Sequence, residues 1–200
     1  MEKTIITLSV VTIILFLLFA AAVLFIIKIL KTQSNYAFNF KRDSRLYSLA
    51  YKDNLTGLFN RNAYIRDLRK LERKKPKSLW FSIFDIDDFK IINDTKGHLF
   101  GDEILISAAN RLCDIFTENN HTVYRIGGDE FLVISENISE DALVALLIKL
   151  KKSEIENNDF RFSKGYSFVE NKGKECFDRA FDNADKMLYA DKNSKKAQNI

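Results

Sequence analysis

The chain contains few of the residues that break or cross-link a protein. Its 200 residues include one proline, seven glycines and two cysteines. The scarcity of proline and glycine excludes a collagen-like or low-complexity chain, and two cysteines are too few for a disulfide framework. Because Cys113 and Cys176 fall in stretches with helical spacing, we expect reduced thiols in a buried core, as is typical of a cytosolic protein.

Neither sign of charge is in large excess. The chain has 31 Lys and Arg against 27 Asp and Glu, a net charge of +4. Without the first thirty residues, which hold Glu2, Lys3 and Lys28, 29 basic and 26 acidic residues remain, a net charge of +3. This balance argues against nucleic acid as a partner. A body of this length can bury a core without cross-links.

One long apolar segment stands at the N-terminus, where no charged residue occurs from Thr4 to Ile27. As a helix this segment would be about 36 Å long, enough to cross a hydrocarbon layer of about 30 Å. A cleaved signal peptide is the alternative, with Ala20 to Ala22 as its cleavage site. The apolar run continues past that point and exceeds an h-region of about 7 to 15 residues. We therefore expect residues 1–30 to be a retained transmembrane anchor.

Basic residues flank this segment unequally. Lys3 precedes it, and the basic residues that follow it are Lys28, Lys31, Lys41, Arg42 and Arg45. The positive-inside rule predicts a single-pass protein of the cytoplasmic membrane with its C-terminal body in the cytoplasm. Residues 31–52 contain neither proline nor glycine, and both a helical stalk and a solvated connector fit them.

The body, residues 53–200, has the pattern of an α+β domain with one sheet flanked by helices. Expected strands cover residues 79–84, 122–126, 131–135 and 160–169. Expected helices begin at Asn60, as N-cap, and at Asp102, and others cover residues 143–150 and 177–188. Gly127 and Gly128 lie between two strands and predict a tight hairpin turn with positive φ.

Two acidic clusters follow predicted strands. Asp85, Asp87 and Asp88 come after the first strand, and Asp129 and Glu130 come after the glycine pair. A crossover through the intervening helix would make the first two strands parallel, so that both clusters reach the same edge of the sheet. Carboxylates brought together need a cation, and Mg²⁺ is the expected one.

Acidic residues also flank turns for purely conformational reasons. This simpler interpretation is strongest for Asp87, Asp88 and Asp94. It is weaker for Asp85 and Asp129, which are tied to a strand end and to a glycine turn.

Five ordered segments of the body resemble one known family. They are 53–61 (DNLTGLFNR), 85–102 with its DIDDFK start, 125–131 (RIGGDEF), 163–165 (SKG) and 184–192. Residues 125–131 match the signature that names the GGDEF family of diguanylate cyclases, and several blocks in order are a specific signal.

The resemblance implies a nucleotidyl-cyclase-like fold with a ferredoxin-like core. It also implies an enzyme that condenses two GTP molecules into cyclic di-GMP and releases two pyrophosphates. The expected cofactor is Mg²⁺ or Mn²⁺. The expected partners are GTP, a second copy of the chain in a catalytic homodimer, and the membrane.

The same resemblance assigns roles to individual residues. The metal ligands it implies are Asp85, the Ile86 carbonyl, Asp129 and Glu130. The implied catalytic residues are Glu130, Asp129 and Lys90. The implied substrate-binding residues are Asn93 and Asp102 at the guanine, Gly127 and Gly128 against the nucleotide, and Asp88, Phe89, Lys90, Lys192 and Lys196 at the phosphates. An amide and a carboxylate suit the guanine edge, whereas adenine would leave them unpaired. His98 is expected to be structural.

Two departures from the family pattern qualify this assignment. Glu118 and His121 stand where members inhibited by their product have an Arg-x-x-Asp pair, so we expect no feedback inhibition there. Lys195 and Lys196 stand where a Gly-Arg pair is usual, and lysine lacks the bidentate fork of arginine.

Two alternative functions remain. They are a catalytically silent module that binds GTP or cyclic di-GMP, and a cyclase with another purine preference. The last strand of the family is expected to be short or missing.

Overall fold

A computed structural model describes residues 23–26, 28–31, 45–157, 159–170 and 173–198. The chain divides into two units, Met1–Ser48 and Leu49–Ile200. In the first unit the described residues, 23–26, 28–31 and 45–48, are helical. Of the predicted anchor, residues 1–30, only 23–26 and 28–30 are among the described residues. Within the described part, no helix combines the length and apolar character needed to cross a membrane.

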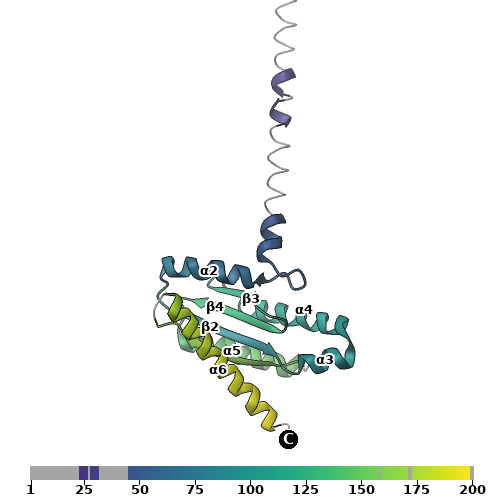
Figure 1. The fold of residues 1–200 in the computed structure, drawn as a ribbon, viewed down its shortest axis with the longest axis vertical. Coiled ribbons are helices and arrows are strands. Elements are labelled where there is room, and N and C mark those ends of the chain that lie inside the picture. Colours follow the sequence, from purple (N-terminus) through teal and green to yellow (C-terminus); the bar gives the residue numbers. More distant parts are fainter. Residues whose placement is uncertain (1–22, 27, 32–44, 158, 171–172, 199–200) are drawn as a thin grey trace, which may run out of the picture. The chain divides into compact units, whose positions relative to one another are not determined.

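The second unit contains the whole sheet and its helices (Figure 1). In chain order the elements are β1 (Phe59–Asn60), α2 (Arg61–Lys74), β2 (Leu79–Ile86), α3 (Phe89–Lys96), α4 (His98–Ile115), β3 (His121–Arg125), β4 (Glu130–Glu136), α5 (Glu140–Asn157), β5 (Phe162–Phe168) and α6 (Lys174–Gln198). The predicted α+β class is confirmed.

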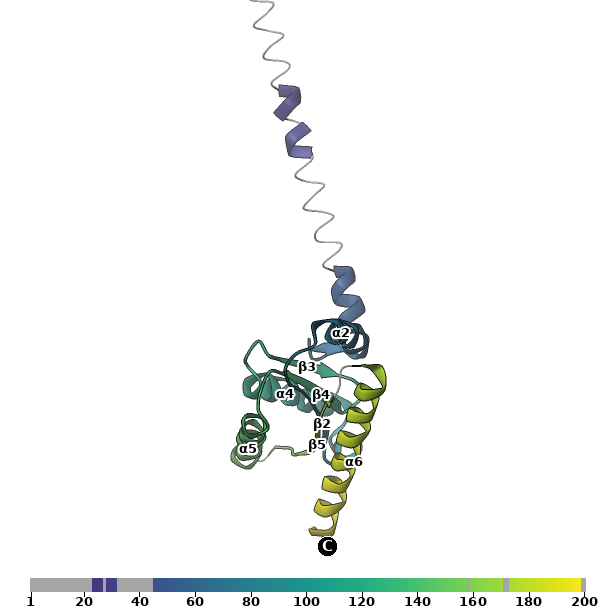
Figure 2. The same cartoon turned by 90° about the vertical axis from the view of Figure 1, so that its left-hand side faces the viewer.

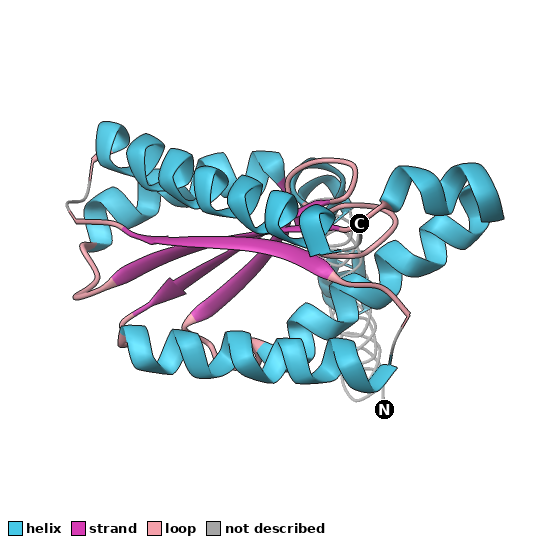
Figure 3. Cartoon of the chain, turned by 90° about the horizontal axis from the view of Figure 1, so that it is seen from below, coloured by secondary structure: helices cyan, strands magenta, loops and turns pink. Residues whose placement is uncertain are grey.

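The five strands form one mixed sheet in the order β1-β3-β4-β2-β5. β2 is antiparallel to both of its neighbours, β4 and β5, and β1 pairs in parallel with β3. All eight residues of β2 are buried, as its unbroken apolar sequence predicted. Helices cover both faces of the sheet in Figure 3.

Two hydrophobic cores lie on the two faces of this sheet. On one face α4 and α5 pack on strand residues such as Phe84 and Phe131. On the other face α2 and α6 pack on Phe81 and Leu132. Figure 2 shows α6 on one side of the strands and α4 and α5 on the other. Alternate residues of β2 and β4 therefore belong to different cores, as the period of a strand requires.

The sequence analysis missed α3 and placed the start of α4 too late. α3 is only eight residues long, and its apolar residues Phe89 and Ile92 are only partly buried, so it is too short for the repeated spacing by which longer helices are predicted. α4 begins at His98 rather than at Asp102, and its N-cap is Gly97. Asp102 is therefore inside the helix and does not cap it. The N-cap at Asn60 is confirmed, because its side chain accepts a hydrogen bond from the Ala63 N–H at 3.1 Å.

Two smaller predictions were wrong. Among the described glycines only Gly57 and Gly97 have positive φ, so the turn at Gly127 and Gly128 does not use the left-handed region. Cys113 is an exposed free thiol rather than a core residue, and Cys176 is half-buried. Helical spacing places Cys113 in α4 correctly but does not show which face of the helix is solvated.

The outer edge of β5 is covered by side chains from the two helices beside it. The Phe162 N–H donates to Glu154 Oε1 at 3.2 Å, and the Lys164 N–H donates to Asp191 Oδ2 at 3.1 Å. The Tyr166 N–H points to the Met187 sulfur at 3.4 Å. Side chains thus satisfy backbone groups that an edge strand would otherwise leave open.

Candidate active site

Asp85 and Asp129 meet at one end of the sheet, as the sequence predicted. β2 and β3 run in the same direction, but β4 lies between them. The turn after β3 therefore returns towards β2 and delivers Asp129 there. The Ile86 N–H donates to the Asp129 carbonyl at 3.3 Å, and Asp85 is the register partner of Glu130. The convergence depends on the hairpin rather than on adjacent parallel strands.

A cleft of about 560 Å³ opens at this end of the sheet. Its lining includes most of the predicted metal and phosphate residues, namely Asp85, Ile86, Asp88, Phe89, Lys90, Asp129, Lys192 and Lys196. The lining also includes residues that the sequence analysis did not select, among them Asp159, Phe160, Arg161 and Lys195. The cleft is therefore bounded by carboxylates on the sheet side and by lysines from the end of α6.

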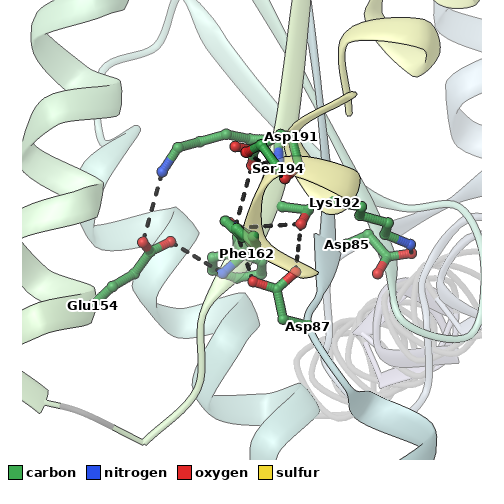
Figure 4. Close-up of polar contacts among 10 residues, drawn as sticks. Asp85, Asp87, Glu154, Phe162, Asp191, Lys192 and Ser194 are labelled. Atoms are coloured by element: carbon green, nitrogen blue, oxygen red, sulfur yellow. Dashed lines mark hydrogen bonds and ion pairs between the residues drawn. The ribbon is translucent and has the colours of Figure 1, made fainter. Parts of the chain in front are cut away.

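Asp85 is the most buried charge in the cleft, with 6% of its surface exposed. Burial raises the pKa of its carboxyl, and the negative charges of Asp129 and Glu130 add to this effect. Lys192 acts in the opposite direction, since its Nζ lies 2.8 Å from Asp85 Oδ2 (Figure 4). The net effect is a raised pKa. The ion pair with Lys192 therefore does not fully offset the cost of burying the charged carboxylate of Asp85.

The chemistry of these donors fits a hard divalent cation. Asp85, Asp129 and the Ile86 main-chain carbonyl supply carboxylate and carbonyl oxygens, the ligand types that Mg²⁺ prefers. Among the described residues, no group of three or more His, Cys, Asp or Glu side chains is placed to hold a metal ion. The cleft thus offers oxygen donors of the right type for a hard divalent cation.

Asp87, the residue that directly follows β2, is bound by the end of α6. Lys195 Nζ lies 2.8 Å from Asp87 Oδ2 and 3.2 Å from Asp191 Oδ2. The same ammonium donates to the Phe162 carbonyl at 2.6 Å, and the Ser163 hydroxyl donates to Asp87 Oδ1. Figure 4 shows these contacts gathered around the end of α6.

Lys196 was predicted to bind phosphate, but no role was predicted for Lys195. The sequence does show that Lys195 is a lysine where the resemblance implies glycine. It does not show that the Lys195 ammonium reaches Asp87 across the cleft.

Asn93 and Asp102 do not line the cleft. They lie nearby on α3 and α4, which are joined only through Gly97. The Asn93 carboxamide rests directly against Gly101, where a β-carbon would collide with it. Asn93 Oδ1 is buried and has no hydrogen-bond partner among the described residues. An unpaired buried acceptor is costly, so this atom is suited to receive a donor from a ligand.

The glycine turn is shaped by its own acidic residue and by an arginine. A β-carbon on Gly127 would lie 2.5 Å from Glu130 Oε2, so the side chain of Glu130 folds over this glycine. Arg125 donates to the Gly128 carbonyl at 2.7 Å and to Asp53 Oδ1 at 3.0 Å. The predicted residues Gly127, Gly128 and Glu130 thus lie beside the cleft rather than in its lining.

Asp53 connects the first family-like segment of the body, residues 53–61, to this turn. Burial pushes the pKa of its carboxyl upward, but hydrogen bonds from Thr56 and the Arg125 guanidinium outweigh burial and lower the pKa overall. The carboxylate therefore stays charged and holds Arg125 in place at the Gly128 carbonyl.

Residues 50–198 match the family model described as "Diguanylate cyclase, GGDEF domain". The chain belongs to the GGDEF family. The resemblance found in the sequence is thus confirmed.

Relatives of known name support this GGDEF assignment. The chain is 32% identical over 164 residues to the probable diguanylate cyclase DgcI of Escherichia coli, covering 81% of this chain and 36% of DgcI. It is 39% identical over 114 residues to the cyclic di-GMP phosphodiesterase PdeR of the same organism, covering 55% of this chain and 17% of PdeR. The chain thus spans about a third or less of these relatives.

The fold is that of a solved GGDEF structure. The coiled coil and GGDEF domain of DgcB from Caulobacter crescentus, solved with cyclic di-GMP, superposes with a TM-score of 0.72 at 20% identity. The match covers 84% of this chain and 93% of that one. At this identity the likeness concerns the fold, which confirms the nucleotidyl-cyclase-like architecture.

Proposed function

We propose that this chain is a membrane-anchored diguanylate cyclase that condenses two GTP molecules into cyclic di-GMP and two pyrophosphates. The observation that supports it best is the cleft in which Asp85 and Asp129 face Lys192 and Lys196. Carboxylates able to hold a divalent cation and lysines able to hold phosphates are the two requirements of phosphoryl transfer.

In this proposal Asp85, Asp129 and the Ile86 carbonyl would hold Mg²⁺ or Mn²⁺, with Glu130 as a further ligand or as the base near the 3′-hydroxyl. The bound metal would supply charge neutralisation at the phosphates and a lower pKa for the attacking hydroxyl. The chain's own cations, Lys90, Lys192 and Lys196, would bind the triphosphate, together with the backbone of Asp88 and Phe89.

The guanine would be bound by α3 and α4. Asn93 Oδ1 is a buried acceptor without a partner among the described residues, and Asp102 follows Gly101, on which the Asn93 carboxamide rests. These groups would accept hydrogen bonds from guanine, and adenine would leave them unpaired. Gly127 and Gly128 would lie against the nucleotide.

The reaction joins two identical halves. The 3′-oxygen of each GTP attacks the α-phosphorus of the other, its proton goes to a base, and each pyrophosphate leaves. One chain offers one such cleft, so two copies must face each other as a homodimer. A membrane anchor formed by residues 1–30, with the body in the cytoplasm, would raise the effective concentration of the copies.

The deciding experiment uses the purified full-length protein in detergent with GTP and Mg²⁺. We expect cyclic di-GMP to form and to disappear in Asp129→Ala, with chromatography as the measurement. A wild-type protein that binds GTP but forms no product would instead establish the silent binding module. That alternative is favoured by one observation, the replacement of the usual Gly-Arg pair by Lys195 and Lys196.

We further propose that the product does not inhibit this enzyme through the position before the signature. The side chain of His121 is held by Ser135, with His121 Nδ1 2.8 Å from Ser135 Oγ. Glu118 is exposed and acidic, so it would repel a phosphate. Initial rates should therefore be unchanged when cyclic di-GMP is added at concentrations below those that compete with GTP.

A further inference from the structure

The net positive charge of the chain is concentrated in one segment. Residues 61–77, which are α2 and the three residues after it, contain eight Lys and Arg and two acidic residues, a net charge of +6. The whole chain has a net charge of +4, so the remaining residues together have −2. The segment is therefore much more basic than the overall composition suggests.

The basic side chains of this segment face solvent. α2 buries Ala63 and Leu71 against the sheet. Positions 61, 65, 69 and 73 follow one another at intervals of four and share a face of the helix. This face presents Arg61, Arg69 and Arg73, all exposed, around Ile65, which is 45% exposed.

The cations of this face are not neutralised by the domain. Lys70 pairs with Asp67 at 2.8 Å and Lys74 pairs with Glu136 at 2.7 Å. By contrast, no carboxylate among the described residues forms an ion pair with the five side chains that we call the α2 basic surface: Arg61, Arg69, Arg73, Lys75 and Lys77. Arg73 donates only along its own helix, to the Arg69 carbonyl at 3.3 Å.

We propose that the α2 basic surface binds the anionic headgroups of a membrane. Basic side chains are attracted electrostatically to an anionic leaflet, and the exposed Ile65 among them favours a lipid interface over the phosphates of a nucleic acid. The other residues of the unit Leu49–Ile200 have a net charge of −6, so this surface is the part of the unit that an anionic membrane would attract. The inference rests on the proposed membrane location, which would bring this domain within reach of an anionic leaflet.

Vesicle sedimentation tests the surface directly. The unit Leu49–Ile200 contains both cores and the whole sheet, so it can be studied without residues 1–48. We expect it to sediment with vesicles of phosphatidylcholine and phosphatidylglycerol, and not with phosphatidylcholine alone. Binding should weaken steeply as salt is raised, because exposed charges are screened over about 8 Å at physiological ionic strength.

Matched double substitutions identify the surface responsible. Arg69→Gln with Arg73→Gln should weaken binding about 25-fold, since each basic side chain near an anionic surface contributes about fivefold. Lys149→Gln with Lys152→Gln removes the same charge from exposed positions of α5, which packs on the opposite face of the sheet from α2. This control pair should leave binding within about twofold of wild type.

Three outcomes would overturn the inference: no sedimentation with anionic vesicles, an equal loss in both double variants, or tighter binding to duplex DNA than to vesicles. Thermal melting of each variant excludes unfolding as the cause. The assay needs neither GTP nor turnover. An inactive protein whose domain still binds vesicles would therefore defeat the proposed function and leave this surface intact.

Discussion

Helices α2 and α6 both contain many basic residues, but the surroundings of these residues differ. At the end of α6, Lys192 lies against Asp85 and Lys195 lies against Asp87, both at 2.8 Å. On α2, Arg69 and Arg73 are exposed and no described carboxylate pairs with them. The same side-chain chemistry is thus directed inward to the cleft in one helix and outward to solvent in the other.

The two helices also differ in the contacts that hold them against the domain. The last buried residue of α6 is Leu188, and beyond it the described residues contact the domain through polar groups. α2 instead packs along its length, with Ala63 and Leu71 buried. Cations position the end of α6, whereas α2 is positioned by apolar packing and its outward cations are available to a partner.

The largest expected effect comes from the carboxylate that Lys192 contacts. Asp85→Asn should lower cyclase activity by roughly a hundredfold or more, because it would remove one of the proposed metal ligands. The measurement is product formation at saturating Mg²⁺. Asp182→Asn, at an exposed position of α6, is the control and should be fully active.

The same substitution should make the metal-free domain more stable at neutral pH. The pKa of Asp85 is raised on folding. Its stabilising contribution is therefore complete below the usual pKa of aspartic acid and is lost as pH rises through the raised value. Asn removes the cost of a charged Asp85, so we expect Tm to rise by about 2 °C at pH 7. A fall in Tm would show that the ion pair with Lys192 outweighs burial.

A smaller effect is expected where Lys195 holds α6. Lys195→Met should raise the KM for GTP about tenfold and change kcat less, because the lysines of α6 would no longer be held over the cleft. Lys195→Arg should restore the KM in part. Amide exchange of residues 189–198 should accelerate in Lys195→Met and not in Lys186→Met, which removes an exposed lysine of the same helix. Unchanged exchange in Lys195→Met would refute this role.

Substitution of a paired arginine should destabilise the protein more than substitution of an unpaired one. Arg125→Ala removes the hydrogen bonds to the Gly128 carbonyl and to Asp53 and should lower the free energy of unfolding by about 2 kcal/mol. Arg61→Ala, on the α2 basic surface, should change it by less than about 0.5 kcal/mol. Urea unfolding of the two variants compares them, and equal losses would contradict the distinction.

The smallest effect is expected on α2 in the absence of lipid. Arg69→Gln with Arg73→Gln should leave cyclase activity in detergent within about twofold of wild type and Tm within about 1 °C. Loss of activity in this variant without lipid would mean that α2 takes part in the reaction itself.

Local sequence patterns predicted most of the domain because its cores are strongly apolar. β2 was found from its unbroken hydrophobic run, and α2 was found from its apolar spacing and its Asn60 cap. α3 was not predicted because its eight residues are too few to repeat the apolar spacing of a helix. The start of α4 was misplaced because its first turn has no capping side chain, only Gly97.

The sequence predicted the parts of the site that are positioned by strand ends. It did not predict the contacts made by long side chains. Asp85 and Asp129 could be brought together from topology alone, although β4 lies between the two parallel strands. The pairing of Lys195 with Asp87 joins residues 108 positions apart, and no local pattern encodes the reach of a lysine. The sequence predicted positive φ at Gly127 and Gly128, but neither glycine has it, and at Gly127 the missing side chain instead leaves room for Glu130.

The side chains that cover β5 also bear on how crowded copies of this domain would behave. Glu154, Asp191 and Met187 occupy the amide groups along the outer margin of the strand. A neighbouring molecule therefore finds no open row of amide groups along β5 on which to add a strand. If the proposed membrane anchor concentrates copies of this domain, that edge would not join them into fibres.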